Sequence, residues 1–110
     1  MKEEYILCSA VWYDNFPLKD KKVLRLRGFS PYNVDRGIVF CGWRHANCIY
    51  QAVAIMDKSS NELGEVEQGF LTSKNRFVSR EEGLKIALKQ NQVLDLKEIR
   101  GDRLFSEDLY

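Results

Sequence analysis

The spacing of hydrophobic residues changes along this chain and separates strands from helices. Ile38 to Cys41 is a short apolar run, which suits a buried strand and is too short for a helix. Gly42 follows, and glycine lets the backbone turn without a Cβ penalty. Residues 36–56 therefore predict a strand, a glycine and then a helix, because apolar residues recur at helical spacing from Ala46 to Met56. These residues are Cys48, Ile49, Ala52, Val53, Ile55 and Met56.

Three other stretches have the character of strands. Tyr5 to Trp12 is rich in aromatic and β-branched residues and predicts a central strand. Val66 to Leu71 predicts a second, and Arg76 to Val78 a short arm after a turn in which Asn75 suits a positive φ. Residues 18–35 alternate briefly and are then broken by glycine, proline and asparagine, which predicts an ordered loop with room for one short strand.

A second helix and an apolar tail complete the chain. Ser79 followed three residues later by Glu82 is a capping box, which predicts a helix start. Asn91 accepts left-handed geometry and is expected to end this helix. Its expected apolar stripe is Leu84, Ala87 and Leu88, with Ile86 at its flank. Residues 93–110 keep too many apolar side chains for a disordered end, so we expect them to pack on the body or on a second subunit.

The order of these elements predicts the fold class. Strands come first, then a helix, a strand–turn–strand unit and a second helix, which is typical of α+β proteins. We expect a small antiparallel or mixed β-sheet with two α-helices packed on one face. A chain of 110 residues normally forms one core, so residues 1–110 are expected to be a single ligand-binding domain.

Charge and cysteine usage narrow the class of protein. The 17 basic and 16 acidic residues leave a net charge of +1, which argues against duplex nucleic acid as the main partner. No stretch has the pattern of a signal peptide or a membrane span. Cys8, Cys41 and Cys48 are odd in number and lie in apolar surroundings, which favours reduced thiols in a cytoplasmic protein.

The junction between the strand and the first helix has the chemistry of a ligand site. Trp43, Arg44 and His45 lie there, at a helix N-terminus with unpaired N–H groups and partial positive charge. A guanidinium, an imidazole and an indole at such a place suit an anionic group attached to a flat ring. We interpret the junction as a candidate nucleotide site; a solvated Arg44 and a satisfied His45 are the alternative.

Two other interpretations of the same region are less favoured. Cys41, His45 and Cys48 have loosely metal-like spacing, but a structural zinc needs four ligands. A cysteine with His45 as its base needs a third orienting group and an exposed thiolate. We therefore predict no metal, no cofactor and no catalytic residue, and the absence of a glycine-rich phosphate loop makes an enzyme the weaker class.

The predicted hairpin, residues 68–77, is a second candidate. It carries hydroxyls, an amide, two cations and two aromatic rings, a set that can stack on a base and hold phosphates. We expect one of Phe70 and Phe77 to point inward and the other toward a ligand. A soluble hairpin with a phenylalanine in the core is the alternative.

Three segments carry a resemblance to a known family. FCGWRHANC (40–48), QGFLTSKNRFVSREE (68–82) and LFSEDLY (104–110) resemble small phage proteins, and the whole is similar to anti-Thoeris sponges, which sequester glycocyclic ADP-ribose signals made by TIR-domain defence enzymes. The resemblance implies a sheet with two helices, an oligomer, and binding without cleavage, in some members also of cyclic oligonucleotides. It implies that Phe70, Asn75, Arg76 and Arg44 hold the adenine and the phosphates.

The leading hypothesis is a phage-encoded, non-enzymatic sponge for a cyclic nucleotide immune signal, acting as a homo-oligomer in the bacterial cytoplasm. The residues expected to touch the ligand are Trp12, Arg44, His45, Phe70, Thr72, Asn75 and Arg76. One rival is a protein that inhibits a host protein by direct binding, through the aromatic tail and residues 28–34. The other is a small enzyme that acts on nucleotides.

Overall fold

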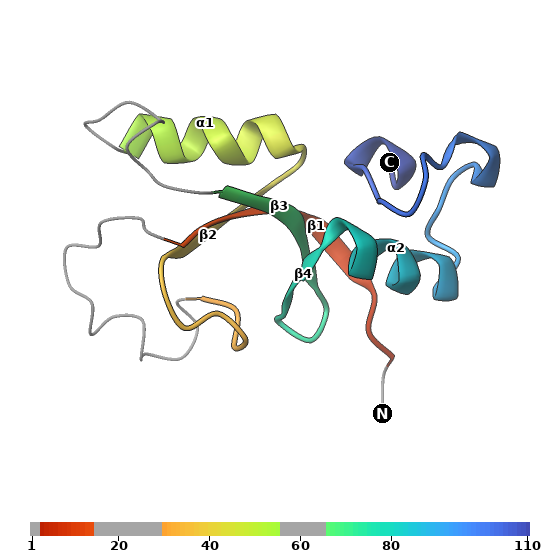
Figure 1. Ribbon diagram of the computed structural model, residues 1–110, viewed down its shortest axis with the longest axis horizontal. Coiled ribbons are helices and arrows are strands. Elements are labelled where there is room, and N and C mark those ends of the chain that lie inside the picture. The colour runs from red at the N-terminus through yellow and green to blue at the C-terminus, as the bar shows by residue number, and fades with distance from the viewer. Residues whose placement is uncertain (1–2, 15–29, 56–65) are drawn as a thin grey trace.

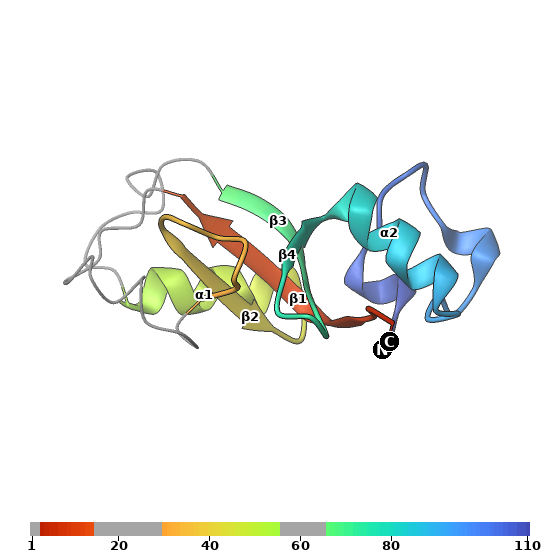
Figure 2. The ribbon, with the colours of Figure 1, turned by 90° about the horizontal axis from the view of Figure 1, so that it is seen from below.

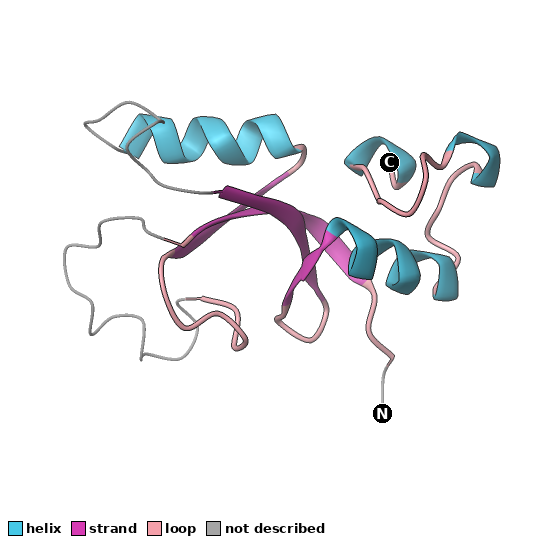
Figure 3. Ribbon diagram, viewed as in Figure 1, coloured by secondary structure: helices cyan, strands magenta, loops and turns pink. Residues whose placement is uncertain are grey.

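The computed structural model describes residues 3–14, 30–55 and 66–110, which form a sheet flanked by helices (Figures 1 and 3). In chain order the elements are β1 (Ile6–Tyr13), β2 (Ile38–Gly42), α1 (His45–Ile55), β3 (Val66–Thr72), β4 (Phe77–Ser79), α2 (Arg80–Lys89) and the short 3-10 helices η3 (Leu96–Glu98) and η4 (Ser106–Asp108). The strand order is β2-β1-β3-β4, and each neighbouring pair is antiparallel. The predicted α+β fold is confirmed, with an antiparallel rather than a mixed sheet.

Both helices pack on the same face of this sheet. Val11 of β1 lies opposite Phe40 of β2 and packs with Cys48 and Ala52 of α1. Phe70 of β3 pairs with Ser9, two residues before Val11, and packs with α2. Side chains two apart on a strand share a face, so the two helices cover neighbouring parts of one face, α1 over β1 and β2 and α2 beside β3 and β4 (Figure 1).

The opposite face is covered in part by the segment that precedes β2. Val34 packs with Ala10 and Phe77 there, and Figure 2 shows this segment, coloured orange, crossing the sheet. The Asn33 side chain donates to the main-chain oxygen of Phe77 at 2.7 Å and accepts from its N–H at 2.8 Å. Residues 30–35 thus form the ordered loop that was expected, while the alternating stretch 23–27 lies outside the described residues.

Helix α1 buries a narrower stripe than its sequence predicts. Cys48 and Ala52 are fully buried, but Val53 and Ile55 are 41% and 67% exposed. Residues 48 and 52 lie one turn apart on a line that meets the sheet, and 53 and 55 are rotated away from it. The predicted stripe is therefore wrong at these two positions, and Met56 lies outside the described residues. No helix in the described part of the chain is long and apolar enough to span a bilayer.

The start of α2 is confirmed and its apolar face is corrected. Ser79 Oγ accepts a hydrogen bond from the Glu82 N–H at 3.2 Å, as an N-cap residue does. Ile86, expected at the flank, is buried, whereas Leu88 is 44% exposed. Asn91 has φ 56°, the left-handed geometry expected after the helix. Ile86 is buried because it belongs to a core that also includes residues of the C-terminal tail.

The C-terminal tail packs on the body of the same chain. Leu104 has no exposed surface and belongs to the core of β1, β3 and α2. Its N–H donates to the Arg80 carbonyl at 3.0 Å, and the Leu94 N–H donates to the Asp108 carbonyl at 2.8 Å. Of the two expectations for this tail, packing on the body is the one that the structure shows.

We predict that Leu104→Ala lowers the free energy of unfolding by about 2–5 kcal/mol, the cost of removing a leucine from a filled core. Urea unfolding followed by circular dichroism measures this. Leu94→Ala is the matched control, because Leu94 is 69% exposed, and should change stability by less than about 0.5 kcal/mol. Equal effects of the two substitutions would contradict the packing of the tail.

Candidate functional site

The turn from β2 into α1 is held rigidly by local contacts. A Cβ added at Gly42 would lie 3.2–3.3 Å from the side chains of three residues of α1, so glycine permits this close approach. The Arg44 N–H donates to Asn47 Oδ1 at 3.0 Å, and the Arg44 carbonyl accepts from the Cys48 N–H at 3.2 Å. No acidic residue lies in the first turn, so the helix itself offers no charge that neutralises its positive end.

Arg44 lies between two aromatic rings at this turn. Its guanidinium carbon is 4.6 Å from the Trp43 ring centroid and 5.0 Å from that of Tyr110. Nη2 donates to the main-chain oxygen of Tyr110 at 2.7 Å, and the Tyr110 hydroxyl donates to the Trp43 carbonyl at 2.6 Å. Nη1 is buried and has no hydrogen-bond partner in the part of the chain that the structure describes. We call Trp43, Arg44 and Tyr110 the Arg44 cluster; it holds a planar cation between two rings with one donor unused.

His45 faces the interior, in contrast to Arg44. It is 8% exposed, its Nε2 lies 2.8 Å from the Gly69 carbonyl, and its ring packs edge-on against Phe70 at 5.1 Å. Burial lowers the pKa of His45 below its ordinary value, and the Gly69 carbonyl opposes this only in part. A neutral, buried imidazole that donates to a main-chain oxygen serves the fold, and a contact between His45 and a ligand stays a prediction.

Neither phenylalanine of the hairpin faces outward. Phe70 is fully buried and Phe77 is 6% exposed. Phe70 points to the face covered by the helices, and Phe77 points to the opposite face with Val34. Both faces of β3 and β4 are covered at this point, so neither ring is exposed in the way that the prediction of a ligand-facing phenylalanine requires.

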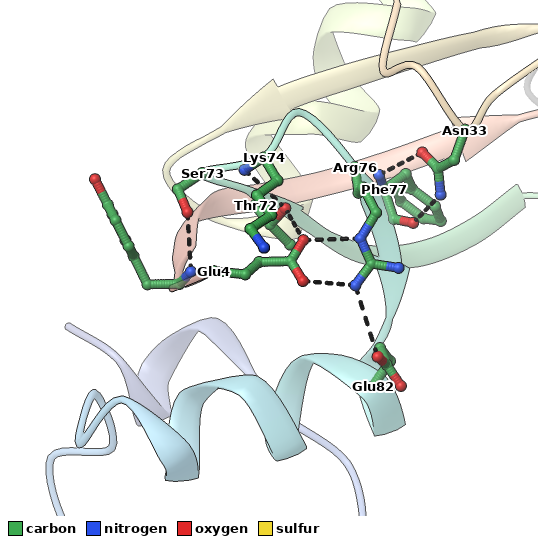
Figure 4. Close-up of polar contacts among 9 residues, drawn as sticks. Glu4, Asn33, Thr72, Ser73, Lys74, Arg76, Phe77 and Glu82 are labelled. Atoms are coloured by element: carbon green, nitrogen blue, oxygen red, sulfur yellow. Dashed lines mark hydrogen bonds and ion pairs between the residues drawn. The ribbon is translucent and has the colours of Figure 1, made fainter. Parts of the chain in front are cut away.

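The polar residues of the hairpin form an internal network around Glu4 (Figure 4). Arg76 donates to the two carboxylate oxygens of Glu4 through Nε at 2.8 Å and Nη2 at 2.7 Å, and Thr72 Oγ1 donates at 2.5 Å. Arg76 also lies 3.7 Å from Glu82. The hydrogen bond from Arg76 lowers the pKa of Glu4 to about 2. Arg76 and Thr72 therefore hold the N-terminal segment against the hairpin.

Asn75 and Trp12 lie away from the Arg44 cluster. Asn75 has φ 58°, as predicted, and its main chain joins the hairpin turn to Tyr32. Trp12 lies on the face away from the helices, where its Nε1 donates to the Arg36 carbonyl at 2.8 Å. The seven predicted residues therefore do not form one site, and only Arg44 lies in the aromatic cluster. Tyr110 was missed as its partner, since no spacing relates two residues this far apart in sequence.

The three cysteines differ in their surroundings and in the pKa of their thiols. Cys48 Sγ is directed at the carbonyls of Ser9 and Arg44, and burial raises the pKa of this thiol to about 11. A hydrogen bond from Cys41 on the neighbouring strand lowers the pKa of Cys8 to about 7 and raises that of Cys41. Within residues 3–14, 30–55 and 66–110, no three histidine, cysteine or acidic side chains are arranged to hold a metal ion.

Comparison with known proteins identifies the family. A family model described as phage T4 y16D protein matches residues 5–110. The chain belongs to this family. No curated protein matches it, and no solved structure matches it either. The expectation of a phage protein is therefore confirmed, and the match covers the whole Arg44 cluster. The family matched is not the anti-Thoeris sponge family that the sequence resembles, and the match carries no support for that resemblance.

The Glu4–Arg76 pair predicts an acid-sensitive contribution to stability. Because the pKa of Glu4 is lowered from 4.5 to about 2, this contribution is fully present above pH 4.5 and is lost as the pH falls toward 2. Unfolding by urea at a series of pH values measures it. In Glu4→Gln the decline between pH 4.5 and 2 should be smaller; an unchanged decline would contradict the assignment to this pair.

The thiol pair predicts selective alkylation. Cys8, with a pKa of about 7, should react with iodoacetamide near neutral pH, whereas Cys48, with a pKa of about 11, should not, since the thiolate is the nucleophile. Mass spectrometry after timed labelling at several pH values measures the labelling rates of Cys8 and Cys48 in one sample. Cys41→Ala should raise the pH at which Cys8 reaches half its maximal labelling rate. In the wild type, a half-maximal pH above 8.5 would contradict the pairing of Cys8 with Cys41.

Proposed function

We propose that this phage protein binds a small nucleotide anion at the Arg44 cluster and sequesters it without cleaving it. The ligand class is a cyclic nucleotide immune signal, a cyclic ADP-ribose isomer or a cyclic oligonucleotide, in the cytoplasm of the infected bacterium. The observation that carries this proposal is the Arg44 guanidinium flanked by two aromatic rings, whose Nη1 has no hydrogen-bond partner among the described residues.

Each part of the cluster supports this ligand chemistry. A guanidinium recognises phosphate through parallel N–H donors, and the adjacent helix N-terminus adds positive potential without an acidic residue in its first turn. Trp43 is 65% exposed, so one face of its indole is open to an adenine ring. Base–aromatic stacking of this kind contributes about 1–3 kcal/mol per base.

The neighbouring side chains support binding over catalysis. The imidazole nearest to Arg44 is that of His45, whose Nε2 is occupied by the Gly69 carbonyl. The nearest thiol, Cys48, has a raised pKa and is directed at two main-chain carbonyls. A general base or a nucleophile must reach the reacting atom in the required protonation state. Neither group meets this condition in the described structure.

A homo-oligomer is part of the proposal. The sequence of α1 contains no Asp, Glu, Lys or Arg, and Tyr50 on its outer side is 70% exposed. Apolar surface next to Trp43 suits contact with a second copy, and enclosing a charged ligand between copies would strengthen its contacts by excluding water.

We predict that the wild-type protein, incubated with glycocyclic ADP-ribose and filtered, retains the signal and releases it intact on heating. Isothermal titration calorimetry then compares Arg44→Ala with the wild type. Loss of a hydrogen bond to a charged group costs about 1.5–3 kcal/mol, so affinity should fall roughly 10- to 150-fold. Arg100→Ala is the matched control, because Arg100 also lies against an aromatic ring, that of Phe105, at 5.3 Å, outside the cluster.

The alternatives give different results in the same experiment. Signal of altered mass after heating would indicate an enzyme. No retention of any cyclic ADP-ribose isomer or cyclic dinucleotide at micromolar concentration would refute the proposal and favour the protein-binding inhibitor.

A further inference from the structure

Strand β3 runs past the strand that pairs with it. β4 pairs only with Gly69 to Leu71, whereas β3 begins at Val66. Val66, Glu67 and Gln68 pair with β1 on one side, and on the β4 side no described residue supplies a strand. Main-chain groups along such an edge are a template for another strand.

Other edges of this sheet are closed by side-chain amides. Gln92 accepts from the Ile6 N–H at 2.8 Å and donates to its carbonyl at 2.9 Å. The Asn33 side chain likewise accepts from the N–H and donates to the carbonyl of Phe77 on β4. No side chain in the described part of the chain closes Val66–Gln68 in this way, so this edge differs from those that the protein protects.

Two hollows flank this edge, and both are lined by Val66 and Glu67. One has a volume of about 400 Å³, and its other lining residues are Gln68, Ser79, Arg80, Glu81 and Arg103. The other has a volume of about 390 Å³ and is also lined by Trp12 and Asp14. Gln68 pairs with Val11, which faces the helices, and Glu67 pairs with Trp12, which faces away. The hollows therefore lie on opposite faces of the sheet.

We propose that an extended segment of a partner protein adds to the sheet at Val66–Gln68 as a further strand. Successive side chains of a strand point to opposite faces, so neighbouring residues of the added segment enter the two hollows. This is the arrangement used in peptide recognition by strand addition, where main-chain hydrogen bonds give affinity and alternate pockets give specificity.

The hollow on the helix face suits an acidic side chain. Arg103 lies there with 63% of its side chain exposed, and its contact with Glu81 is a loose 3.4 Å. Arg80 lies beside it and donates to Gln68 Oε1 and to the Leu104 carbonyl, at 2.6 and 2.8 Å. Both bonds go to uncharged oxygens, so a carboxylate entering this hollow would meet a guanidinium that has no acidic hydrogen-bond partner among the described residues.

The hollow on the other face suits a basic side chain. It is lined by Trp12, Asp14, Val66 and Glu67, two of which are acidic. A cation of the chain itself contacts two of these residues, since the Arg36 guanidinium lies 5.9 Å from the Trp12 ring centroid and 3.9 Å from the Asp14 carboxylate. Glu67 has no salt bridge in the described residues, so a lysine or arginine of the added strand would face it directly.

The charge pattern favours a different protein over a second copy of this chain. Two-fold antiparallel pairing centred on Glu67 would place the two Glu67 carboxylates opposite each other, and like charges in this position destabilise a strand pair. The partner that fits is therefore an extended peptide with adjacent acidic and basic residues. This site lies apart from the Arg44 cluster and does not depend on the nucleotide proposal.

The test uses fluorescence anisotropy with a labelled, end-blocked peptide, Thr-Val-Thr-Glu-Lys-Val-Thr. We expect saturable binding to the full chain, weakened roughly three- to thirtyfold by Glu67→Lys and by Arg103→Glu. A peptide with glutamate in place of the lysine should restore binding to Glu67→Lys. The controls are Glu98→Lys and Lys85→Glu, which make the same charge changes at exposed positions and should bind as the wild type does.

Three outcomes would overturn this inference. The first is that no saturable binding is seen up to millimolar peptide. The second is that Glu67→Lys binds the peptide with the same affinity as its control, Glu98→Lys. The third is concentration-dependent self-association that Glu67→Lys abolishes, which would make a second copy of the chain the occupant. Circular dichroism of each variant verifies that it is folded. Arg44→Ala should bind the peptide normally, so failure of the nucleotide proposal and failure of this one are distinguishable.

Discussion

The burial of Phe70 is the contact on which the rest of this structure depends. Its side chain has no exposed surface, and its ring meets His45 of α1 edge-on at 5.1 Å. A Cβ at Gly83 of α2 would come within 3.0 Å of the Phe70 ring and 3.5 Å of Leu104, so glycine allows helix, strand and tail to meet there. One aromatic side chain thus joins the sheet, both helices and the C-terminal tail, as expected where large rings dominate a small core.

This packing decides which polar groups remain for function. His45 is drawn into the core beside Phe70, and Arg76 and Thr72 of the hairpin hold Glu4. Arg44, one residue before His45, is half-buried between Trp43 and Tyr110, because successive residues at a helix start point in different directions. The tail that buries Leu104 also brings Tyr110 to Arg44. The aromatic cluster is therefore a consequence of the same core that buries both phenylalanines of the hairpin.

Local signals in the chain predicted the elements well and their faces less well. The strands, the Ser79 cap and the positive φ of Asn75 and Asn91 follow from interactions within a few residues, so they can be inferred from spacing and residue type. The predicted apolar faces of both helices were wrong at individual residues, because Val53, Ile55 and Leu88 are exposed and Ile86 is buried. Which apolar residues are buried depends on where a sheet and a tail lie, and helical periodicity contains no such information.

The sequence by itself determined the α+β class, the order of elements, the turn chemistry and the presence of Trp43 and Arg44 at a helix start, because each is a matter of local propensity. Only the tertiary structure decided that Tyr110 lies against Arg44, that Arg76 pairs with Glu4, and that β3 extends beyond β4. These are contacts between residues distant along the chain. They arise when strands find their register and buried side chains fill the core, and no single stretch of sequence specifies them.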